Sequence, residues 1–200
     1  MTVINNDLSI FTNKNENGIK LSDRLNTVLT NSKYFDVLVG YFRITGFYLL
    51  KEQLENVEEI RILIGLGADI ETIRAMDIFE LSGANATRKV QKVIMEEFNN
   101  SEDDNLEMEN GVFKFCEWIK SGKLKIRMCY EKNVHAKLYI VRKDPDKVPD
   151  QFGNLITGSS NFTFNGLDKN VEFNVELKNQ SDVQYGLDFF EELWKDSKDI

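Results

Sequence analysis

The order of apolar segments constrains the fold of this chain more than any other feature. Two continuous apolar runs, residues 37–42 and 60–66, have the length of buried strands, and a stretch with helical spacing, residues 45–55, separates them. Farther along, strand-like segments follow one another, at residues 124–130, 135–141, 155–157 and 171–177. Helices that alternate with strands early, and strands that neighbour each other late, predict an α/β fold with a mixed sheet sandwiched between helices.

Further elements follow from apolar spacing and turn residues. We expect helices over residues 21–31, 70–99 (with a break near 82–85), 106–120 and 183–195. Residues 144–153 hold both prolines and a glycine between two expected strands, which predicts a hairpin excursion rather than a domain linker. A chain of 200 residues with 42% hydrophobic content and no internal repeat is expected to form one domain, residues 1–200.

The cysteines and the N-terminus lead us to expect a cytoplasmic protein. Cys116 and Cys129 lie in apolar surroundings and form no C-x-x-C pair, which indicates reduced core thiols. The N-terminus is polar and lacks the layout of a signal peptide, and no apolar run approaches the roughly 20 residues that span a bilayer. The polar N-terminus and the short apolar runs therefore lead us to expect no membrane association. Two cysteines and a single histidine are too few soft ligands for a zinc site, so we also expect no metal.

The charge of the chain is unevenly distributed. The formal net charge of −8 by itself disfavours a polyanionic partner. Residues 96–109, however, hold seven acids and no base, whereas residues 120–147 hold nine Lys or Arg against three acids. Such a polarised domain can present a basic face to phosphate, although the pattern also fits ordinary solvated charged faces.

The single histidine lies beside a lysine in an expected strand. The strand period of two places one set of side chains on one face (His135, Lys137 and Tyr139) and the next set on the other (Ala136, Leu138 and Ile140). An imidazole beside an ammonium group is a plausible phosphate site, but an H-x-K pair alone also arises by chance.

A second polar group follows downstream. Residues 158–167, GSSNFTFNGL, come directly after one strand, and residues 170–174, NVEFN, open the next. On that strand we expect Asn170, Glu172 and Asn174 to share one face, while Val171, Phe173 and Val175 face the core. Ser159 and Asn161 alone are typical of a simple turn. Together with the histidine segment, they place an unusual number of polar side chains at the ends of adjacent strands. Because buried polar groups need hydrogen-bond partners, this concentration indicates a functional site.

Together these motifs resemble the signature of the phospholipase D superfamily: H-x-K at 135–137, G-S-x-N-F-T-x-x-G-L at 158–167 and N-x-E at 170–172. The lead-in over residues 39–47 and 60–65 is similar to the N-terminal phospholipase-D-like domains of bacterial SNF2-type helicases and related restriction endonucleases. The resemblance runs from about residue 20 to about residue 193. It implies a phospholipase D-like fold and suggests that the chain is the N-terminal part of a larger helicase-type protein.

The resemblance also implies a role for each matching residue. His135 would be the nucleophile that attacks phosphorus and forms a phosphohistidine. Lys137 and Asn161 would bind the non-bridging oxygens, and Ser159 would donate a hydrogen bond at the same site. Glu172 would orient the imidazole and set its tautomer. No cofactor is implied.

Two features depart from the family pattern. The family places an Asp five residues after the Lys, where this chain has Arg142; Asp144 could substitute only if the strand is bulged. Family chemistry uses two H-x-K motifs, one histidine attacking and the other protonating the leaving group, and this chain supplies one. A symmetric homodimer is the simplest route to the pair.

The expected function is that of a metal-independent phosphodiesterase or nuclease that acts on DNA. The main alternative is a catalytically weak DNA- or partner-binding module attached to a helicase, which Arg142 and the acidic total charge favour. A lipid-headgroup phosphodiesterase is a third possibility, which the lack of a membrane-seeking amphipathic stretch disfavours.

Overall fold

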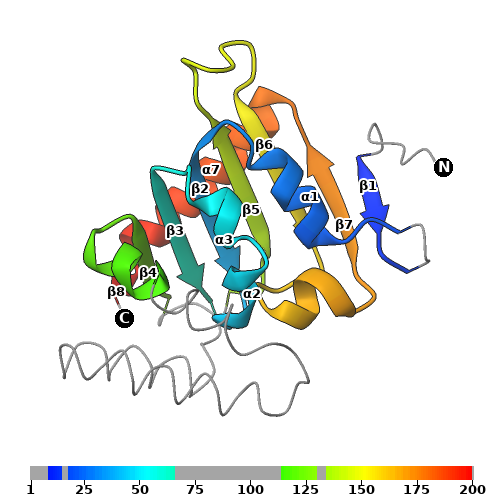
Figure 1. Cartoon of the computed structure of the whole chain (residues 1–200), viewed down its shortest axis with the longest axis horizontal. Coiled ribbons are helices and arrows are strands. Elements are labelled where there is room, and N and C mark those ends of the chain that lie inside the picture. The colour runs from blue at the N-terminus through cyan, green and yellow to red at the C-terminus, as the bar shows by residue number, and fades with distance from the viewer. Residues whose placement is uncertain (1–8, 15–17, 66–113, 130–133, 200) are drawn as a thin grey trace.

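The chain forms one mixed sheet with helices on both faces. The computed structural model describes residues 9–14, 18–65, 114–129 and 134–199. The strands of this part form one sheet in the order β1-β7-β6-β5-β2-β3-β4-β8 (Figure 1). Their bounds are β1 (Ile10–Thr12), β2 (Ser32–Val39), β3 (Glu59–Ile64), β4 (Leu124–Met128), β5 (Leu138–Lys143), β6 (Gly153–Gly158), β7 (Phe173–Leu177) and β8 (Lys198–Asp199).

The predicted mixed sheet and the hairpin after β5 are confirmed. Strands β2, β3 and β4 run parallel to one another, whereas every other neighbouring pair is antiparallel. Strand β5 returns directly as β6, with the two prolines in the connection between them. The short outer strands β1 and β8 were not predicted, because segments of two or three residues carry too little periodicity to be recognised.

The larger hydrophobic core lies between one face of the sheet and the helices α1 (Leu21–Val28), α2 (Thr45–Tyr48) and α3 (Lys51–Leu54), together with the helical residues 114–120. Alternate positions of β2, such as Val37 and Val39, point into this core because side chains of a strand alternate between faces. Leu21 and Leu25 lie about one helical turn apart and are buried on the inner face of α1.

Helix α7 (Gln180–Lys195) covers the other face of the sheet, where a second core gathers around Leu38, Ile140, Leu155 and Phe190. This core also holds charge. Arg61 of β3 donates to Asp36 of β2 at 2.6 Å and to Glu191 of α7 at 2.7 Å, and its guanidinium lies over the ring of Phe190. The ion pairs satisfy charges that would otherwise be costly to bury.

The predicted orientation of β7 is wrong. Phe173 is 55% exposed and Val171 is 68% exposed, whereas Asn174 and Glu176 are buried on the α1 side of the sheet. Glu176 is held there by Arg24 of α1, whose Nη2 lies 2.5 Å from Oε2, and by Asn154 of β6 at 2.6 Å. A buried ion pair, rather than an apolar side chain, therefore decides which face of β7 points inward.

Other predicted elements differ mainly in their ends. Residues 45–55 form two short helices instead of one, and the helix predicted over 21–31 ends at Val28. The predicted helix over residues 70–99, and residues 106–113 of the next one, lie outside the described residues. Cys116 and Cys129 are buried free thiols, as predicted.

Candidate functional site

Every residue assigned to the site lies at one end of the sheet. Because β2 and β3 run in the direction opposite to β5, the ends of β2, β3 and β6 lie beside the beginnings of β5 and β7. The register pairs Leu38 with Leu138 and Leu138 with Thr157, and Gly158 lies opposite Asn174. In Figure 1 this end is at the bottom, beside α2 and opposite the β5–β6 hairpin.

The histidine segment, residues 134–137, precedes β5 rather than belonging to it. It passes close to the end of β3, where a Cβ on Gly65 would lie 2.2 Å from the carbonyl oxygen of Val134, so only glycine permits this approach. The imidazole of His135 is exposed. The Nζ of Lys137 donates to the carbonyl oxygen of His135 at 3.1 Å, so the ammonium group lies near the histidine backbone.

Tyr139 does not share the polar face of His135 and Lys137, contrary to expectation. The strand period applies only from Leu138 onward, and Tyr139 is fully buried in the larger core. Its hydroxyl donates to the carbonyl oxygen of Ser160 at 3.0 Å. Burial, with a smaller contribution from the charge of Glu172, raises the pKa of Tyr139 well above its ordinary value, so the hydroxyl stays a donor.

The loop that carries Ser159 and Asn161 is fastened by aromatic packing. Phe162 is buried, with its ring centroid 5.5 Å from that of Phe42 and 6.3 Å from that of Tyr139. The backbone N–H of Arg43 donates to the carbonyl oxygen of Phe162 at 2.9 Å. Rigid anchoring of a site loop keeps its polar groups in a fixed geometry.

Ser159 and Glu172 are in direct contact. The hydroxyl of Ser159 donates to Oε2 of Glu172 and accepts the backbone N–H of Phe173 at 3.1 Å. A Cβ on Gly158 would lie 2.3 Å from the carbonyl oxygen of Phe173, so this glycine allows the two strands to approach here. Ser159 and Glu172, which come from two separate segments of the chain, are therefore neighbours in the structure.

Asn161 is oriented by the end of β2. Its Oδ1 accepts the backbone N–H of Tyr41 at 3.0 Å. With the carbonyl oxygen bound in this way, the amide NH2 group remains as a donor. A donor is what an anionic phosphate oxygen requires.

Sequence reasoning missed Asn13, which holds the segment before β7. Its Nδ2 donates to the carbonyl oxygen of Asn170 at 2.6 Å, and its Oδ1 accepts the backbone N–H of Glu172 at 2.9 Å. No local pattern could have indicated this, because Asn13 lies in a polar stretch more than 150 residues away.

The five predicted residues therefore form two contacting pairs and one separately held amide. Lys137 contacts the backbone of His135, Ser159 contacts Glu172, and Asn161 contacts the end of β2. Within the described residues, no hydrogen bond joins Glu172 to the imidazole of His135. Nor does any group of three His, Cys, Asp or Glu side chains in that part form a candidate metal site.

Arg142 and Asp144 lie at the opposite end of β5, away from the site. Nη2 of Arg142 contacts Oδ2 of Asp36 at 3.1 Å, and the guanidinium lies 4.2 Å from the ring centroid of Tyr34. Asp144 pairs with Lys147 at 3.2 Å and accepts the backbone N–H of Asp146, a bond that lowers the pKa of its carboxyl. Asp144 therefore does not take the place of the family Asp.

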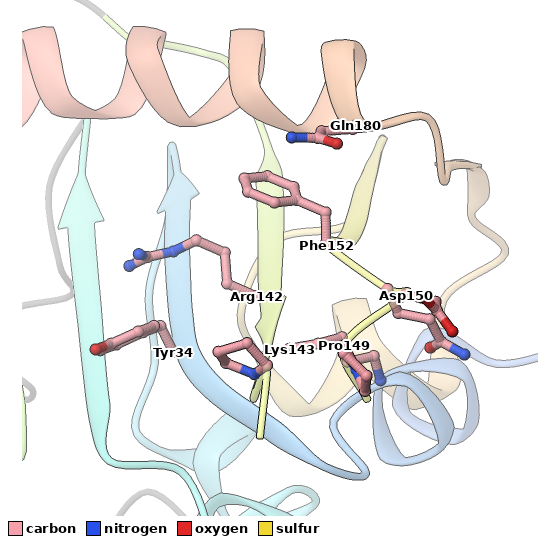
Figure 2. A pocket seen from close by; sticks show the side chains of 9 residues that line it. Tyr34, Arg142, Lys143, Pro149, Asp150, Phe152 and Gln180 are labelled. Atoms are coloured by element: carbon pink, nitrogen blue, oxygen red, sulfur yellow. The ribbon is translucent and has the colours of Figure 1, made fainter. Parts of the chain in front are cut away.

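A pocket of about 380 Å³ opens beside Arg142, at this far end of the sheet. Figure 2 shows the rings of Tyr34 and Phe152 on either side of the Arg142 side chain, with Gln180 of α7 beyond. The pocket contains none of the predicted site residues, so it is separate from the histidine site.

Most of the basic side chains in residues 120–147 bind within the chain itself. Lys125, Arg127, Arg142 and Lys147 pair with acids, and Lys123 and Lys143 donate to backbone carbonyls. The basic stretch is therefore largely engaged in stabilising the fold, and only part of it is available for a phosphate backbone.

Helix α7 and the other helices in the described residues are too short or too polar to cross a membrane.

Comparison with known proteins identifies a family that this chain matches. Residues 29–194 match the family described as "Cardiolipin synthase, PLD-like domain". No curated protein sequence matches the chain.

Among solved structures, the chain is similar to NucT from Helicobacter pylori, with 12% identity, a TM-score of 0.50, and 96% of this chain and 98% of that chain covered. It is also similar to phosphatidylserine synthase from Haemophilus influenzae Rd KW20, with 16% identity, a TM-score of 0.50, and 95% and 38% covered. The phospholipase D family member Nuc from Salmonella typhimurium has 15% identity and a TM-score of 0.41, with 88% of each chain covered. At these identities the likeness to NucT and to phosphatidylserine synthase shows the fold alone.

Proposed function

The chain belongs to the phospholipase D-like family, and on that premise we propose that it is a phosphodiesterase that cleaves DNA through a phosphohistidine intermediate. One observation carries the proposal: the H-x-K segment, the Ser159–Asn161 loop and Glu172 converge at a single end of the sheet. Residues from three separate segments would not gather there for packing, because their side chains are largely outside the core.

The chemistry follows from the groups present. An imidazole nitrogen of His135 attacks phosphorus, the P–N bond forms as the P–O bond to the leaving group breaks, and a second imidazole protonates the departing oxygen. Water then attacks the phosphohistidine with the second imidazole as base, which releases the phosphate product and restores His135. The ammonium of Lys137 and the amide of Asn161 stabilise the charge on the non-bridging oxygens.

In this scheme the Glu172 carboxylate interacts with the imidazole of His135 as that ring changes between its neutral and its cationic form. The Glu172 carboxylate accepts a hydrogen bond from the Ser159 hydroxyl. The Nδ2 of Asn170, two residues earlier in the chain, lies 3.5 Å from Oε1 of Glu172. We propose that substrate binding draws the Ser159 hydroxyl toward the phosphate and frees the carboxylate for the imidazole. Hydrogen bonds between catalytic groups are often long in the free enzyme and shorten only when the substrate is bound.

These 200 residues supply one of the two imidazoles, because they hold a single histidine, His135. We propose a two-fold dimer in which the partner subunit's His135 protonates the leaving group. The exposed imidazole of His135 at the sheet end is accessible to such a partner.

A binding module is the second candidate function. It is favoured by Arg142, which stands in the position of the family Asp and pairs with Asp36. In this alternative the chain is the N-terminal part of a larger helicase-type protein and docks DNA or a partner without cutting it.

The decisive experiment combines turnover with trapping of the intermediate. Wild-type protein is mixed with a nitrophenyl phosphodiester and with plasmid DNA, quenched in alkali, and digested for mass spectrometry. A phosphoryl adduct on the peptide containing His135, absent in His135→Ala, is the expected result. Cleavage without any adduct would overturn the mechanism, and absence of cleavage on both substrates would favour the binding module. A phospholipid substrate added in parallel distinguishes the lipid-headgroup reaction.

A further inference from the structure

Two exposed aromatic side chains lie at the histidine end of the sheet. Among the described residues, four large aromatic side chains are exposed: Tyr41 after β2, Phe173 at the start of β7, and Tyr185 and Phe189 on α7. Tyr41 is 42% exposed and Phe173 is 55% exposed. Single exposed apolar residues are ordinary on a protein surface. Tyr41 and Phe173, however, are each bonded to a residue of the candidate site.

Tyr41 is fixed beside Asn161. The backbone N–H of Tyr41 donates to Oδ1 of Asn161 at 3.0 Å. The next residue, Phe42, is buried, forms a bridge with Phe162 and stacks on its ring at 5.5 Å between centroids. The core therefore holds the backbone of Tyr41 beside a proposed phosphate ligand and leaves the Tyr41 side chain largely outside.

Phe173 is fixed in the same way beside Ser159. The backbone N–H of Phe173 donates to Oγ of Ser159 at 3.1 Å, and its carbonyl oxygen accepts the backbone N–H of Ser159 at 3.1 Å. Phe173 also follows Glu172 directly in the chain. Each of the two exposed rings is thus carried by backbone that is bonded to a residue proposed to act on the phosphate.

The candidate site lies between the two rings. Strands β6 and β5 separate β7 from β2 (Figure 1). Three inter-strand steps of roughly 4.8 Å place the rings about 14 Å apart across the sheet. Ser159 and Asn161 follow β6, and Lys137 precedes β5, so the groups that would hold the phosphate occupy this interval. A substrate that crosses this end of the sheet passes one ring, then the phosphate ligands, then the other ring.

We propose that Tyr41 and Phe173 stack on nucleobases on either side of the scissile phosphate, so that the site selects an unpaired nucleic acid strand. The inference rests on the proposed function, whose site it extends from the phosphate to the bases. The face of a base is open to an aromatic side chain only where the base is unpaired and separated from its neighbour. Because every base has such a face, stacking gives little sequence preference.

The charge of the chain favours stacking as a source of affinity. The formal net charge is −8, and most Lys and Arg side chains of residues 120–147 bind within the chain itself. Binding through phosphates alone depends on cations that displace counterions from the nucleic acid. Aromatic stacking adds affinity without a cation. A phospholipid headgroup offers no aromatic ring to stack on, which favours a nucleic acid as the occupant.

Fluorescence anisotropy with a labelled thymidine oligonucleotide tests this, with Tyr41→Leu and Phe173→Leu as the variants. Leucine removes the ring and keeps an apolar side chain. Each variant should bind the intact strand about tenfold more weakly, and should bind an abasic strand of the same length like wild type. Tyr41→Phe keeps the ring and should bind both strands like wild type. Tyr185→Leu, at an exposed aromatic residue of α7, is the matched control and should also behave like wild type.

Cleavage of the same strands provides the second readout. Leucine variants that bind like wild type, or a wild type that binds the abasic strand or a duplex as tightly as the intact single strand, overturn the stacking role. If such a wild type still cleaves DNA, the proposed function stands without the stacking role. Base-dependent binding that both leucine variants lose, without cleavage of any strand, leaves the stacking surface standing and refutes the phosphodiesterase instead. Unchanged circular dichroism of the leucine variants establishes that they are folded.

Discussion

Asn13 and Glu172 are joined by a hydrogen bond of 2.9 Å from the backbone N–H of Glu172 to Oδ1 of Asn13, although 159 residues separate them in the chain. The same carboxamide donates to the carbonyl oxygen of Asn170. One side chain thus fixes the backbone on both sides of Val171 and with it the direction in which the Glu172 carboxylate leaves the chain. Asn13 is a positioning residue in the proposed mechanism.

Replacing Asn13 by Ala should lower kcat about tenfold with little change in KM, because the carboxylate is misplaced while the phosphate ligands remain. Steady-state kinetics on a nitrophenyl phosphodiester measures both constants. Asn13→Asp keeps the acceptor for the Glu172 N–H and should retain more activity than Asn13→Ala. Lys14→Ala, one residue away and exposed, is the control. Equal kcat in wild type and Asn13→Ala would show that the contact is merely structural.

His135→Ala should abolish turnover while DNA affinity stays nearly unchanged. The imidazole contributes bond-making in the transition state and little ground-state binding. Lys137→Ala should reduce both, since it removes a phosphate contact as well as charge stabilisation, and the salt dependence of binding should flatten slightly. Fluorescence anisotropy with labelled DNA and a cleavage assay at several salt concentrations measure these effects. Wild-type cleavage rates in His135→Ala would end the catalytic interpretation.

Phosphodiester cleavage should persist in excess EDTA. The proposed scheme assigns the electrostatic work of a cation to Lys137, Asn161 and the paired imidazoles. Rates measured before and after chelation, and after addition of magnesium, provide the test. Loss of activity on chelation with recovery in magnesium would contradict the phosphohistidine mechanism.

Arg142→Asp restores the family residue but should destabilise the fold by about 3 kcal/mol or more, because it places a second carboxylate beside the buried Asp36. Arg142→Met, which removes the charge and keeps the stem, should cost less. Urea unfolding measures both. Since Arg142 lies about 16 Å along β5 from Lys137, at roughly 3.3 Å per residue, activity per folded molecule should not change. A gain in activity in Arg142→Asp would show that the motif Asp has a role here.

The free energy of unfolding should fall between about pH 9 and pH 11. Burial raises the pKa of the Cys116 thiol to about 11, so in this window the unfolded chain has released a proton that the folded chain keeps. The folded state then binds more protons, and stability declines as pH rises. Cys116→Ser should show a shallower decline, and the difference between the two curves isolates the thiol from other titrating groups. Parallel curves would mean that Cys116 ionises alike in both states.

Local sequence predicted the six strands β2 to β7 and the placement of the candidate site motifs beside them. The apolar runs of β2 and β3 and the proline-containing excursion after β5 follow from periodicity and turn chemistry, which depend only on neighbours in the chain. The H-x-K, Ser159–Asn161 and Glu172 motifs sit beside strands, so their placement at strand ends followed from the strand pattern. Strand ends that share a sheet edge then bring such motifs together.

Tertiary contacts decided what periodicity could not. β7 reads as an apolar-polar alternation that could face either way, and the Arg24–Glu176 ion pair from a distant helix selects its orientation and leaves Val171 and Phe173 outside. Likewise, the partner of Arg142 is Asp36 on the neighbouring strand, and the partner of Glu172 is Asn13 at the other end of the chain. A hydrogen bond or ion pair depends on the distance between atoms in space, which the order of residues along the chain does not contain.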